Sequence, residues 1–319
     1  MNIERYDYLK KVISNKKVMP FSVELHPTND CNQDCIWCIM RDIRREGEKL
    51  THNQLLRIAI ELYKNKQTKQ IFLTGGGDPL VSNELFDEYE YEGVKFQTYF
   101  ELLYKLDIYP SISTNGENLT RLIDSGAYLY LDELRVSVDA GTEDQYVKLH
   151  RSKNRISLHE IVENIEQYHK ISGKKIEISY LLHPINKNGY TELAQMFYDA
   201  EAVSRIVVKP LRGEKNFVCE EDRVVNGIPI CFPKIKTVPE KNFATHTHIV
   251  ISAKGDIYPC CHAMDYGTQY MYGNIKNECI EEVIKKKYDY LTNVWNCSRC
   301  NRLEINRILN AFYKMEIDK

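Results

Sequence analysis

The 319-residue sequence predicts an α/β fold, a partial (β/α)6 barrel followed by a C-terminal extension. Two observations support this fold class. Between residues 21 and 212, six short runs of β-forming residues alternate with amphipathic helical stretches. After about residue 212 the chain becomes loop-like and rich in cysteine. Six strand–helix units are fewer than the eight of a complete barrel. We therefore expect three parts: a segment at 1–20, a barrel at 21–212 and an appended domain at 213–319.

The barrel elements are predicted in chain order from local pattern. The expected strands cover 21–26, 70–75, 109–114, 133–139, 175–182 and 205–211. The expected helices cover 52–66, 118–126, 157–173 and 191–203, where apolar residues recur at helical spacing. Gly126 and Gly173 mark two helix ends. Strands that alternate with helices in this way favour a parallel sheet with helices on the outside.

The C-terminal third contains seven of the ten cysteines. Its stretch "THTHIVISAKGDIYPCCH" predicts a hairpin that turns at Lys254, Gly255 and Asp256, and a helix is expected near 280–290. No low-complexity linker separates this part from the barrel, so we expect the two to pack together.

Charge and hydropathy limit the classes of partner. The chain has 43 Lys and Arg against 45 Asp and Glu, a net charge of −2 that predicts neither nucleic-acid binding nor attraction to anionic lipid. The first 17 residues carry no apolar core of a signal peptide, and no stretch approaches the roughly 18 apolar residues of a membrane span. We therefore expect a cytoplasmic protein, a compartment where clustered cysteines usually bind metal or perform redox chemistry.

Three cysteines, Cys31, Cys35 and Cys38, follow the first expected strand with CxxxCxxC spacing. In a strand–helix barrel this loop lies at the C-terminal face, where ligands bind. Thiolates select zinc or iron–sulfur clusters, and structural zinc usually takes four protein ligands. A four-iron cluster on three thiolates keeps one iron open to another ligand. The alternative is a zinc site completed by His26 or His52.

The CxxxCxxC motif, with the aromatic Trp37 before its last cysteine, resembles the signature of the radical S-adenosylmethionine (SAM) superfamily. The resemblance implies a partial (β/α)6 barrel and a [4Fe-4S] cluster on Cys31, Cys35 and Cys38, with SAM on the open iron. It also implies reductive cleavage of SAM to a 5′-deoxyadenosyl radical, which abstracts a hydrogen atom from the substrate. A flavodoxin- or ferredoxin-type protein would donate the electron.

The glycine-rich stretch "LTGGGDPL" ends the second expected strand and resembles the superfamily's GGE motif, which binds the SAM amino group. Gly75, Gly76 and Gly77 allow backbone groups to approach a ligand closely. Asp78 stands where glutamate is usual and is one methylene shorter. It can still accept hydrogen bonds, so the resemblance assigns it to the SAM site.

The third expected strand ends in Ser113, Thr114 and Asn115, which resemble the donors to the SAM ribose. The alternative is an ordinary polar turn after a strand.

On the fourth strand, Ser137 and the later Arg151 resemble the pair that holds the SAM carboxylate. The alternative is that Arg151 is a surface arginine with no part in the SAM site. Asp139 lies two residues after Ser137 on the same strand face and is expected to contact SAM or the substrate.

A second set of cysteines resembles the auxiliary-cluster site of SPASM and twitch domains. Its members are Cys231, Cys260 in "GDIYPC", and Cys297 and Cys300 in "CSRC". No cysteine follows Cys300, so the chain resembles the shorter twitch type with one auxiliary [4Fe-4S] cluster.

Other occupants and ligands remain open at this second site. Cys219 is the alternative to Cys231 as a ligand, and Cys261 is the alternative to Cys260. Zinc is the competing metal, because four thiolates with a CxxC pair also suit structural zinc.

These features predict a radical SAM oxidoreductase that dehydrogenates a small polar metabolite, such as an amino sugar, with the auxiliary cluster as electron acceptor. The runner-up is crosslinking, epimerisation or oxidation of a ribosomally made peptide. Only about 20 residues precede the first strand, fewer than a leader-peptide-binding domain needs. A non-catalytic iron–sulfur protein would not need the SAM motifs at successive strand ends. Candidates for the substrate base are Lys209, Arg135, Tyr180 and Glu24.

Overall fold

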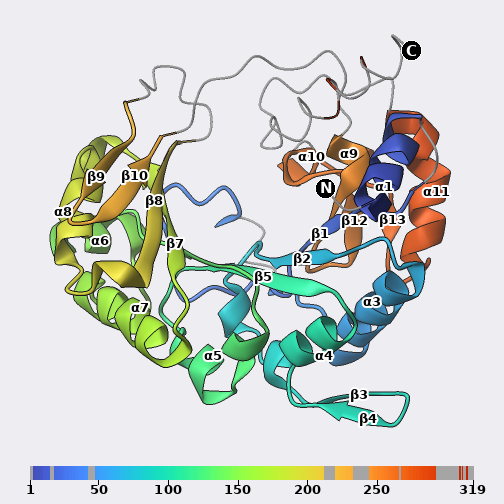
Figure 1. Ribbon diagram of the computed structural model, residues 1–319, viewed down its shortest axis with the longest axis horizontal. Coiled ribbons are helices and arrows are strands. Elements are labelled where there is room, and N and C mark those ends of the chain that lie inside the picture. The colour runs from blue at the N-terminus through green and yellow to red at the C-terminus, as the bar shows by residue number, and fades with distance from the viewer. Residues whose placement is uncertain are drawn as a thin grey trace.

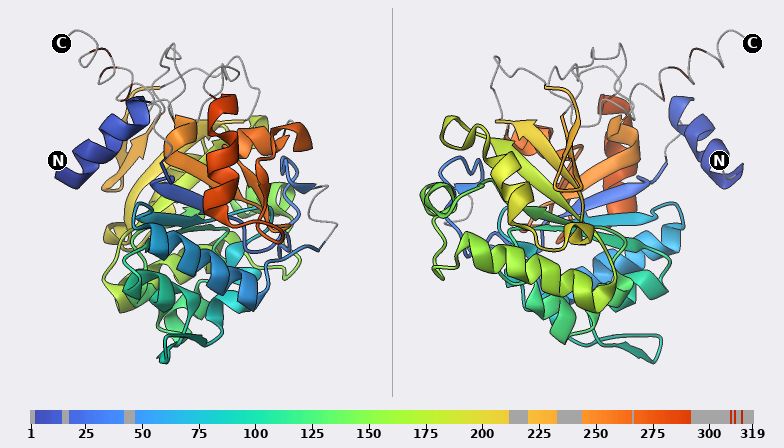
Figure 2. Two further views of the ribbon diagram at one scale, coloured as in Figure 1. Left: turned by 90° about the vertical axis from the view of Figure 1, so that its right-hand side faces the viewer. Right: turned by 60° about the vertical axis from the view of Figure 1, so that its left-hand side comes forward.

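The computed structural model describes residues 3–14, 18–41, 47–211, 220–232, 244–265, 267–291, 309, 311 and 314. An eleven-stranded sheet in the order β13-β12-β11-β1-β2-β5-β6-β7-β8-β10-β9 curves through the molecule (Figure 1). Helices cover its convex side, as the two turned views also show (Figure 2). The result is a partial barrel of mixed α/β type.

The six predicted barrel strands are all confirmed, and each pairs in parallel with the next. They are β1 (Ser22–Leu25), β2 (Gln70–Leu73), β5 (Tyr109–Thr114), β6 (Leu134–Ser137), β7 (Ile176–Leu182) and β8 (Val203–Pro210). Parallel pairing brings the carboxyl ends of all six strands to one edge of the sheet. The loops that carry the predicted site residues therefore meet there.

The helices around the barrel differ from expectation in three places. They are α3 (His52–Asn65), α4 (Tyr99–Lys105), α5 (Thr120–Asp124), α6 (Glu143–His150), α7 (Leu158–Ser172) and α8 (Gly189–Met196). Helices α4 and α6 were not predicted, because they are only two turns long and leave little periodic signal. The helix expected at 191–203 ends at Met196, and a 3₁₀ turn at Ala200–Ala202 precedes β8.

Smaller elements complete the described part of the chain. The N-terminal helix α1 covers Ile3–Ile13, and a two-stranded hairpin is formed by β3 (Tyr89–Tyr91) and β4 (Val94–Phe96). Further 3₁₀ turns cover Pro79–Val81, Glu84–Phe86, Ala127–Tyr130, Pro184–Asn186 and Thr268–Tyr270. No helix within the described ranges has the length and apolar character needed to cross a membrane.

The C-terminal third extends the barrel sheet at both edges. Its elements are β9 (Arg223–Val225), β10 (Ile228–Cys231), α9 (Ala244–Thr247), β11 (His248–Ile251), β12 (Asp256–Tyr258), α10 (Cys261–Asp265), β13 (Gly273–Asn274) and α11 (Ile280–Leu291). Strand β10 pairs with β8, and β11 pairs with β1, both in parallel. The expected β11–β12 hairpin and the expected helix near 280–290 are confirmed.

The hairpin of β9 and β10 corrects the expectation of a loop in this region. Asn226 and Gly227 both have positive φ at its turn, with values of 50° and 77°. Asn-Gly between two strands is the strongest short-range hairpin signal, so the sequence did contain the information.

A buried cluster of polar side chains joins β1 to β11. The Glu24 carboxylate lies 3.0 Å from His26 Nε2 and 3.5 Å from His248 Nε2. Ser22 Oγ lies 3.0 Å from His248 Nδ1. Burial raises the pKa of Glu24, but hydrogen bonds from His248 and His26 outweigh it and lower the pKa well below its usual range. The ionised carboxylate thus helps hold the C-terminal third against the first barrel strand.

The lowered pKa of Glu24 predicts a pH-dependent stability. Its contribution is complete above the ordinary glutamate pKa of 4.5 and is lost as the pH falls below that value. Urea unfolding between pH 3 and pH 7 should show a fall in midpoint on acidification that is shallower in Glu24→Gln than in the unchanged protein. An equal fall of the urea midpoint with pH in the two proteins would contradict the assignment of this effect to Glu24.

Candidate active site

The three cysteines of the CxxxCxxC motif lie in the loop after β1; none of them forms a disulfide, and all three are partly buried. The backbone N–H of Gln33 donates to Cys31 Sγ at 3.4 Å, and the Asn115 side-chain amide approaches the same sulfur at 3.9 Å. His150 Nδ1 lies 3.6 Å from Cys35 Sγ. N–H groups directed at sulfur favour thiolates over thiols, because hydrogen bonds to the charged form stabilise it. The donors at Cys31 therefore suit a thiolate that binds metal, whereas Cys35 Sγ also lies 3.5 Å from the Gln33 side-chain oxygen.

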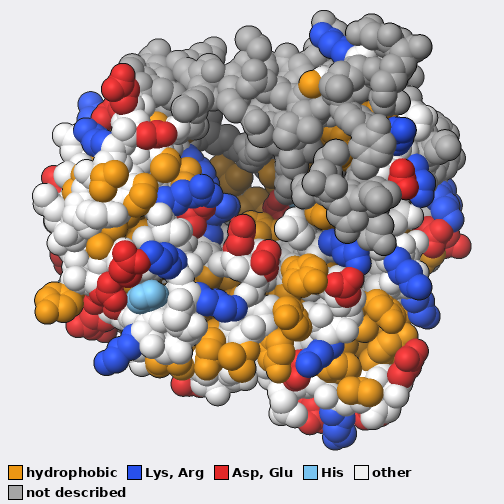
Figure 3. All heavy atoms as spheres, in the orientation of Figure 1, with side chains coloured by type: hydrophobic (Ala, Val, Ile, Leu, Met, Phe, Trp, Pro, Cys, Tyr) orange, Lys and Arg blue, Asp and Glu red, His pale blue; other side chains and the backbone are white. Residues whose placement is uncertain are grey.

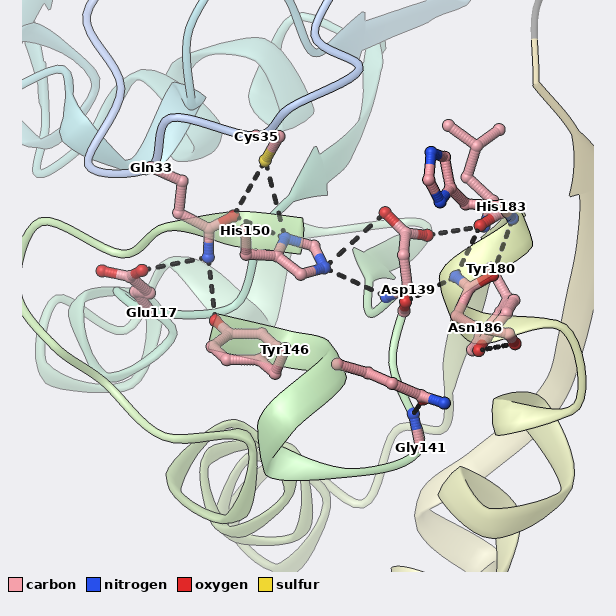
Figure 4. A network of polar contacts seen from close by, with 12 residues as sticks. Gln33, Cys35, Glu117, Asp139, Gly141, Tyr146, His150, Tyr180, His183 and Asn186 are labelled. Atoms are coloured by element: carbon pink, nitrogen blue, oxygen red, sulfur yellow. Dashed lines mark hydrogen bonds and ion pairs between the residues drawn. The ribbon is translucent and has the colours of Figure 1, made fainter. Parts of the chain in front are cut away.

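A buried network holds this loop from below (Figure 4). Gln33 Oε1 lies 2.8 Å from His150 Nδ1, and Gln33 Nε2 donates to Glu117 and to the Tyr146 hydroxyl, each at 2.9 Å. Gln33, Tyr146 and His150 are each only 1% exposed. Burial lowers the pKa of His150 to about 3, so its ring is neutral at physiological pH. The network ties the cysteine loop to α6.

Asp139 lies at the other end of this network, just after β6. Its backbone N–H donates to His150 Nε2 at 3.2 Å, and one carboxylate oxygen accepts from Leu181 N–H at 2.6 Å. Burial raises the pKa of Asp139 to about 7. A carboxyl group that titrates near neutrality is typical of functional sites. Its predicted contact with SAM or substrate stays a prediction.

The glycine-rich turn after β2 packs tightly on the cysteine loop. A Cβ on Gly76 would lie 2.0 Å from Asn29 Oδ1, and one on Gly77 would lie 1.8 Å from the Asp30 carbonyl oxygen. Gly75 has φ +149° and faces the His26 side chain. Glycine is therefore required at these positions, because the turn after β2 and the loop after β1 approach each other closely. Their predicted contact with SAM stays a prediction.

The carboxylate of Asp78 connects the ends of β2 and β5. It accepts from the Thr114 hydroxyl at 2.8 and 3.0 Å, from Asn115 N–H at 2.7 Å and from Leu80 N–H at 2.9 Å. Burial raises its pKa to about 6, against the opposing effect of these hydrogen bonds. In this structure Asp78 connects the turn after β2 to the end of β5.

The remaining predicted SAM residues occupy the same edge of the sheet. Ser113 is on β5, and Ser137 ends β6 in register with Ser179 of β7. Arg151 follows α6 with φ 50° and is exposed. The Trp37 ring lies 5.6 Å from His150 and 5.8 Å from His183, measured between centroids. The predicted contact of Ser137 and Arg151 with the SAM carboxylate stays a prediction.

Both histidines of the zinc alternative have other partners. His26 is hydrogen-bonded to Glu24, and His52 stacks on Tyr89 with ring centroids 4.1 Å apart. Among the described residues, no three or more His, Cys, Asp and Glu side chains are arranged to hold one metal ion.

A charged network lies across β6, β7 and β8. Glu177 accepts from Arg135 Nε at 2.5 Å and from Arg205 Nε at 2.7 Å, and the three residues are in register. Lys209 Nζ donates to Ser179 Oγ at 3.3 Å on the same strand face. Burial and the Arg135 charge lower the pKa of Lys209 to about 8.

This network lies on the concave side of the barrel. Tyr180, one residue away from Ser179, points to the opposite side, where its hydroxyl donates to the Asn186 carbonyl and approaches the start of α8. On the face shown in Figure 3, acidic and basic side chains are interspersed without a large field of one sign.

The predicted auxiliary ligands are only partly described. Cys231 ends β10 and Cys260 follows β12, two strands near opposite ends of the sheet order. Cys261 begins α10, and both Cys260 and Cys261 pack on Val250, Tyr258 and Ala263. Cys219, Cys297 and Cys300 lie outside the described residues. The auxiliary ligand set stays a prediction.

Two family models match the sequence. One is the model of the radical SAM superfamily, which matches residues 25–197 and so more than half of the chain. The chain belongs to the radical SAM superfamily. The second is the SPASM model, an iron-sulfur cluster-binding domain, which matches residues 243–304. This radical SAM protein therefore uses a [4Fe-4S] cluster and SAM, and its SPASM domain adds an auxiliary iron–sulfur cluster.

Solved structures share the fold of this radical SAM protein at low sequence identity. SuiB of Streptococcus suis bound to precursor peptide SuiA has a TM-score of 0.62 at 15% identity, covering 88% of this chain and 67% of SuiB. Native anSMEcpe with bound AdoMet has a TM-score of 0.57 at 14% identity, covering 89% and 87%. The chain thus spans about two thirds of the length of SuiB. No curated protein sequence matches the chain.

Gln33 and His150 are the site residues that sequence reasoning missed. Both are buried, uncharged at neutral pH and distant in sequence, and neither belongs to a motif that the resemblance supplied. A glutamine inside the CxxxCxxC loop was the only local signal, since a polar side chain between ligands has to find a partner when the loop is buried.

Asp78→Asn should destabilise the protein by about 1–3 kcal/mol, because asparagine has one acceptor oxygen for two buried N–H groups, those of Leu80 and Asn115. Urea unfolding of the cluster-free protein at pH 7 measures the change. Asp107→Asn is the matched control, since Asp107 is more than half exposed and its ion pair with Lys69 should contribute no more than about 1 kcal/mol. Equal midpoints for the two variants would contradict the role given to Asp78.

Proposed function

We propose that this radical SAM enzyme oxidises a small polar metabolite, such as an amino sugar, by removing two hydrogens. The observation that carries the proposal is the charged network of Glu177, Arg135 and Arg205 with the half-buried Lys209 on the concave face. Charged and polar groups in a concave site favour a polar substrate, because an apolar one would remove water from them without offering hydrogen bonds of its own.

Cys31, Cys35 and Cys38 are the proposed ligands of the SAM-binding cluster, and the N–H groups directed at Cys31 and Cys35 support this assignment. When bound there, the reduced cluster would supply the electron for reductive cleavage of SAM, the chemistry that permits abstraction of a hydrogen atom from the substrate. A flavodoxin- or ferredoxin-type protein is the proposed electron donor. The residues proposed to shape the SAM site are Trp37, Gly75, Gly76, Gly77, Asp78, Ser113, Thr114, Asn115, Ser137, Asp139 and Arg151.

The second half of the oxidation has to remove one proton and one electron from the substrate. Lys209 is the proposed base, because its pKa of about 8 leaves part of its population neutral at physiological pH. The electron is proposed to pass to the auxiliary cluster, with Cys231, Cys260, Cys297 and Cys300 as its proposed ligands. Loss of the hydrogen atom, the proton and the electron balances as a two-electron dehydrogenation.

Peptide modification is the second candidate. It is favoured by the likeness of the fold to SuiB bound to its precursor peptide and to anSMEcpe with AdoMet and the Kp18Cys peptide, the latter with a TM-score of 0.56 at 15% identity.

The two candidates differ in the mass of the substrate. The reconstituted enzyme, SAM and dithionite should form more 5′-deoxyadenosine when a low-mass metabolite extract is added. Mass spectrometry should then find a product lighter by two hydrogens. Stimulation only by the peptide fraction of the same extract would overturn the metabolite proposal.

Cys35→Ala should abolish 5′-deoxyadenosine formation and remove about four of about eight iron atoms per chain, because an iron–sulfur cluster needs its thiolate ligands. Anaerobic reconstitution followed by iron analysis measures the loss. Cys279→Ala is the control, since Cys279 precedes α11 and is not a proposed ligand. Cleavage of SAM by Cys35→Ala would overturn the ligand assignment. An iron content near four with bound zinc in the unchanged protein would overturn the auxiliary cluster.

A further inference from the structure

The buried network beneath the cysteine loop has a fixed direction of proton donation. Asp139 contributes its backbone N–H, which is always a donor, and this group points at His150 Nε2 at 3.2 Å. Nε2 must therefore be the accepting nitrogen, and the ring proton is on Nδ1. The Asp139 carboxylate oxygen, at 3.7 Å from Nε2, is too distant for a hydrogen bond.

The Nδ1–H of His150 faces two acceptors, Gln33 Oε1 at 2.8 Å and Cys35 Sγ at 3.6 Å. Gln33 cannot turn its amide to offer N–H instead, because its Nε2 is held by the Glu117 carboxylate and the Tyr146 hydroxyl. The ring itself is fixed, since it stacks on Tyr146 with centroids 4.6 Å apart. Figure 4 shows Cys35 above the ring at the Nδ1 side.

We propose that His150 is a positioning residue for the SAM-binding cluster: it donates Nδ1–H to the Cys35 thiolate and thereby raises the reduction potential of that cluster. The inference rests on the proposed ligand set. A reduced cluster carries one more negative charge, so an N–H directed at its thiolate stabilises the reduced form more than the oxidised one. Gln33 shares the same proton and weakens this effect.

Because Gln33 and Cys35 share the Nδ1 proton of His150, two substitutions should move the reduction potential of the cluster in opposite directions. His150→Phe keeps an aromatic ring in the pocket but removes the donor, so the potential should fall. Gln33→Met removes the competing carbonyl, so Nδ1–H is left with sulfur alone and the potential should rise. Tyr146→Phe is the matched control, because it removes a buried hydrogen bond from the same network without touching the N–H to sulfur.

The experiment is an EPR-monitored redox titration of the full, reconstituted chain. The signal that changes when SAM is added belongs to the cluster with the open iron, which separates it from the auxiliary cluster. We expect His150→Phe to lower the equilibrium constant for reduction by about tenfold, equivalent to ~59 mV for one electron. Gln33→Met should shift it upward, and Tyr146→Phe should leave it unchanged. Thermal unfolding of the cluster-free proteins should show all three variants destabilised.

The outcomes are distinct. Absence of any SAM-responsive signal in the unchanged protein would reject the proposed function itself. A SAM-responsive signal with the same potential in His150→Phe and Tyr146→Phe would overturn the role of His150 and leave the enzyme class intact. If His150→Phe does not fold, Gln33→Met decides alone, and an unchanged or lowered potential there overturns the proposal.

Discussion

The close approach of two backbone segments at the carboxyl edge of the sheet determines where the site residues lie. The turn after β2 donates Gly77 N–H to the Thr28 carbonyl at 3.0 Å and Asp78 N–H to the Asp30 carbonyl at 2.9 Å. Both carbonyls belong to the loop that leads directly into Cys31. Any side chain on Gly76 or Gly77 would overlap this loop. The glycines therefore fix the start of the cysteine loop, and the positions of its sulfurs follow.

Buried polar groups then hold the rest of the site. Asp78 satisfies donors from β5 and from its own turn, and the His150 ring connects the cysteine loop to the end of β6. In these two networks the buried N–H groups of Leu80, Asn115, Gln33 and Asp139 each meet an acceptor, and such pairing is the condition for a buried network to be stable. Removal of one member leaves others unpaired, so rigidity in the site depends on the full set.

The barrel was predictable because its signal is local. Short β-rich runs, helical periodicity and the cysteine spacing each occupy a few neighbouring residues, and all six strands were confirmed. The short helices α4 and α6 were missed for the same reason, since two turns give too few periodic positions. The hairpin of β9 and β10 was missed although its Asn226-Gly227 turn was legible. The carboxyl edge of the sheet, and with it the location of the site, followed from the parallel order alone.

By itself, the sequence determined the fold class, the three-cysteine motif and the residue types at each strand end, because these depend on spacing along the chain. Only the tertiary structure decided which of those residues meet. It showed that Asp78 is engaged by Thr114 and Asn115 and that β11 extends the barrel beside β1. It also brought His150, from the end of a helix 115 positions later in the chain, within 3.6 Å of Cys35. Contacts of this kind depend on the packing of distant segments, which no local pattern records.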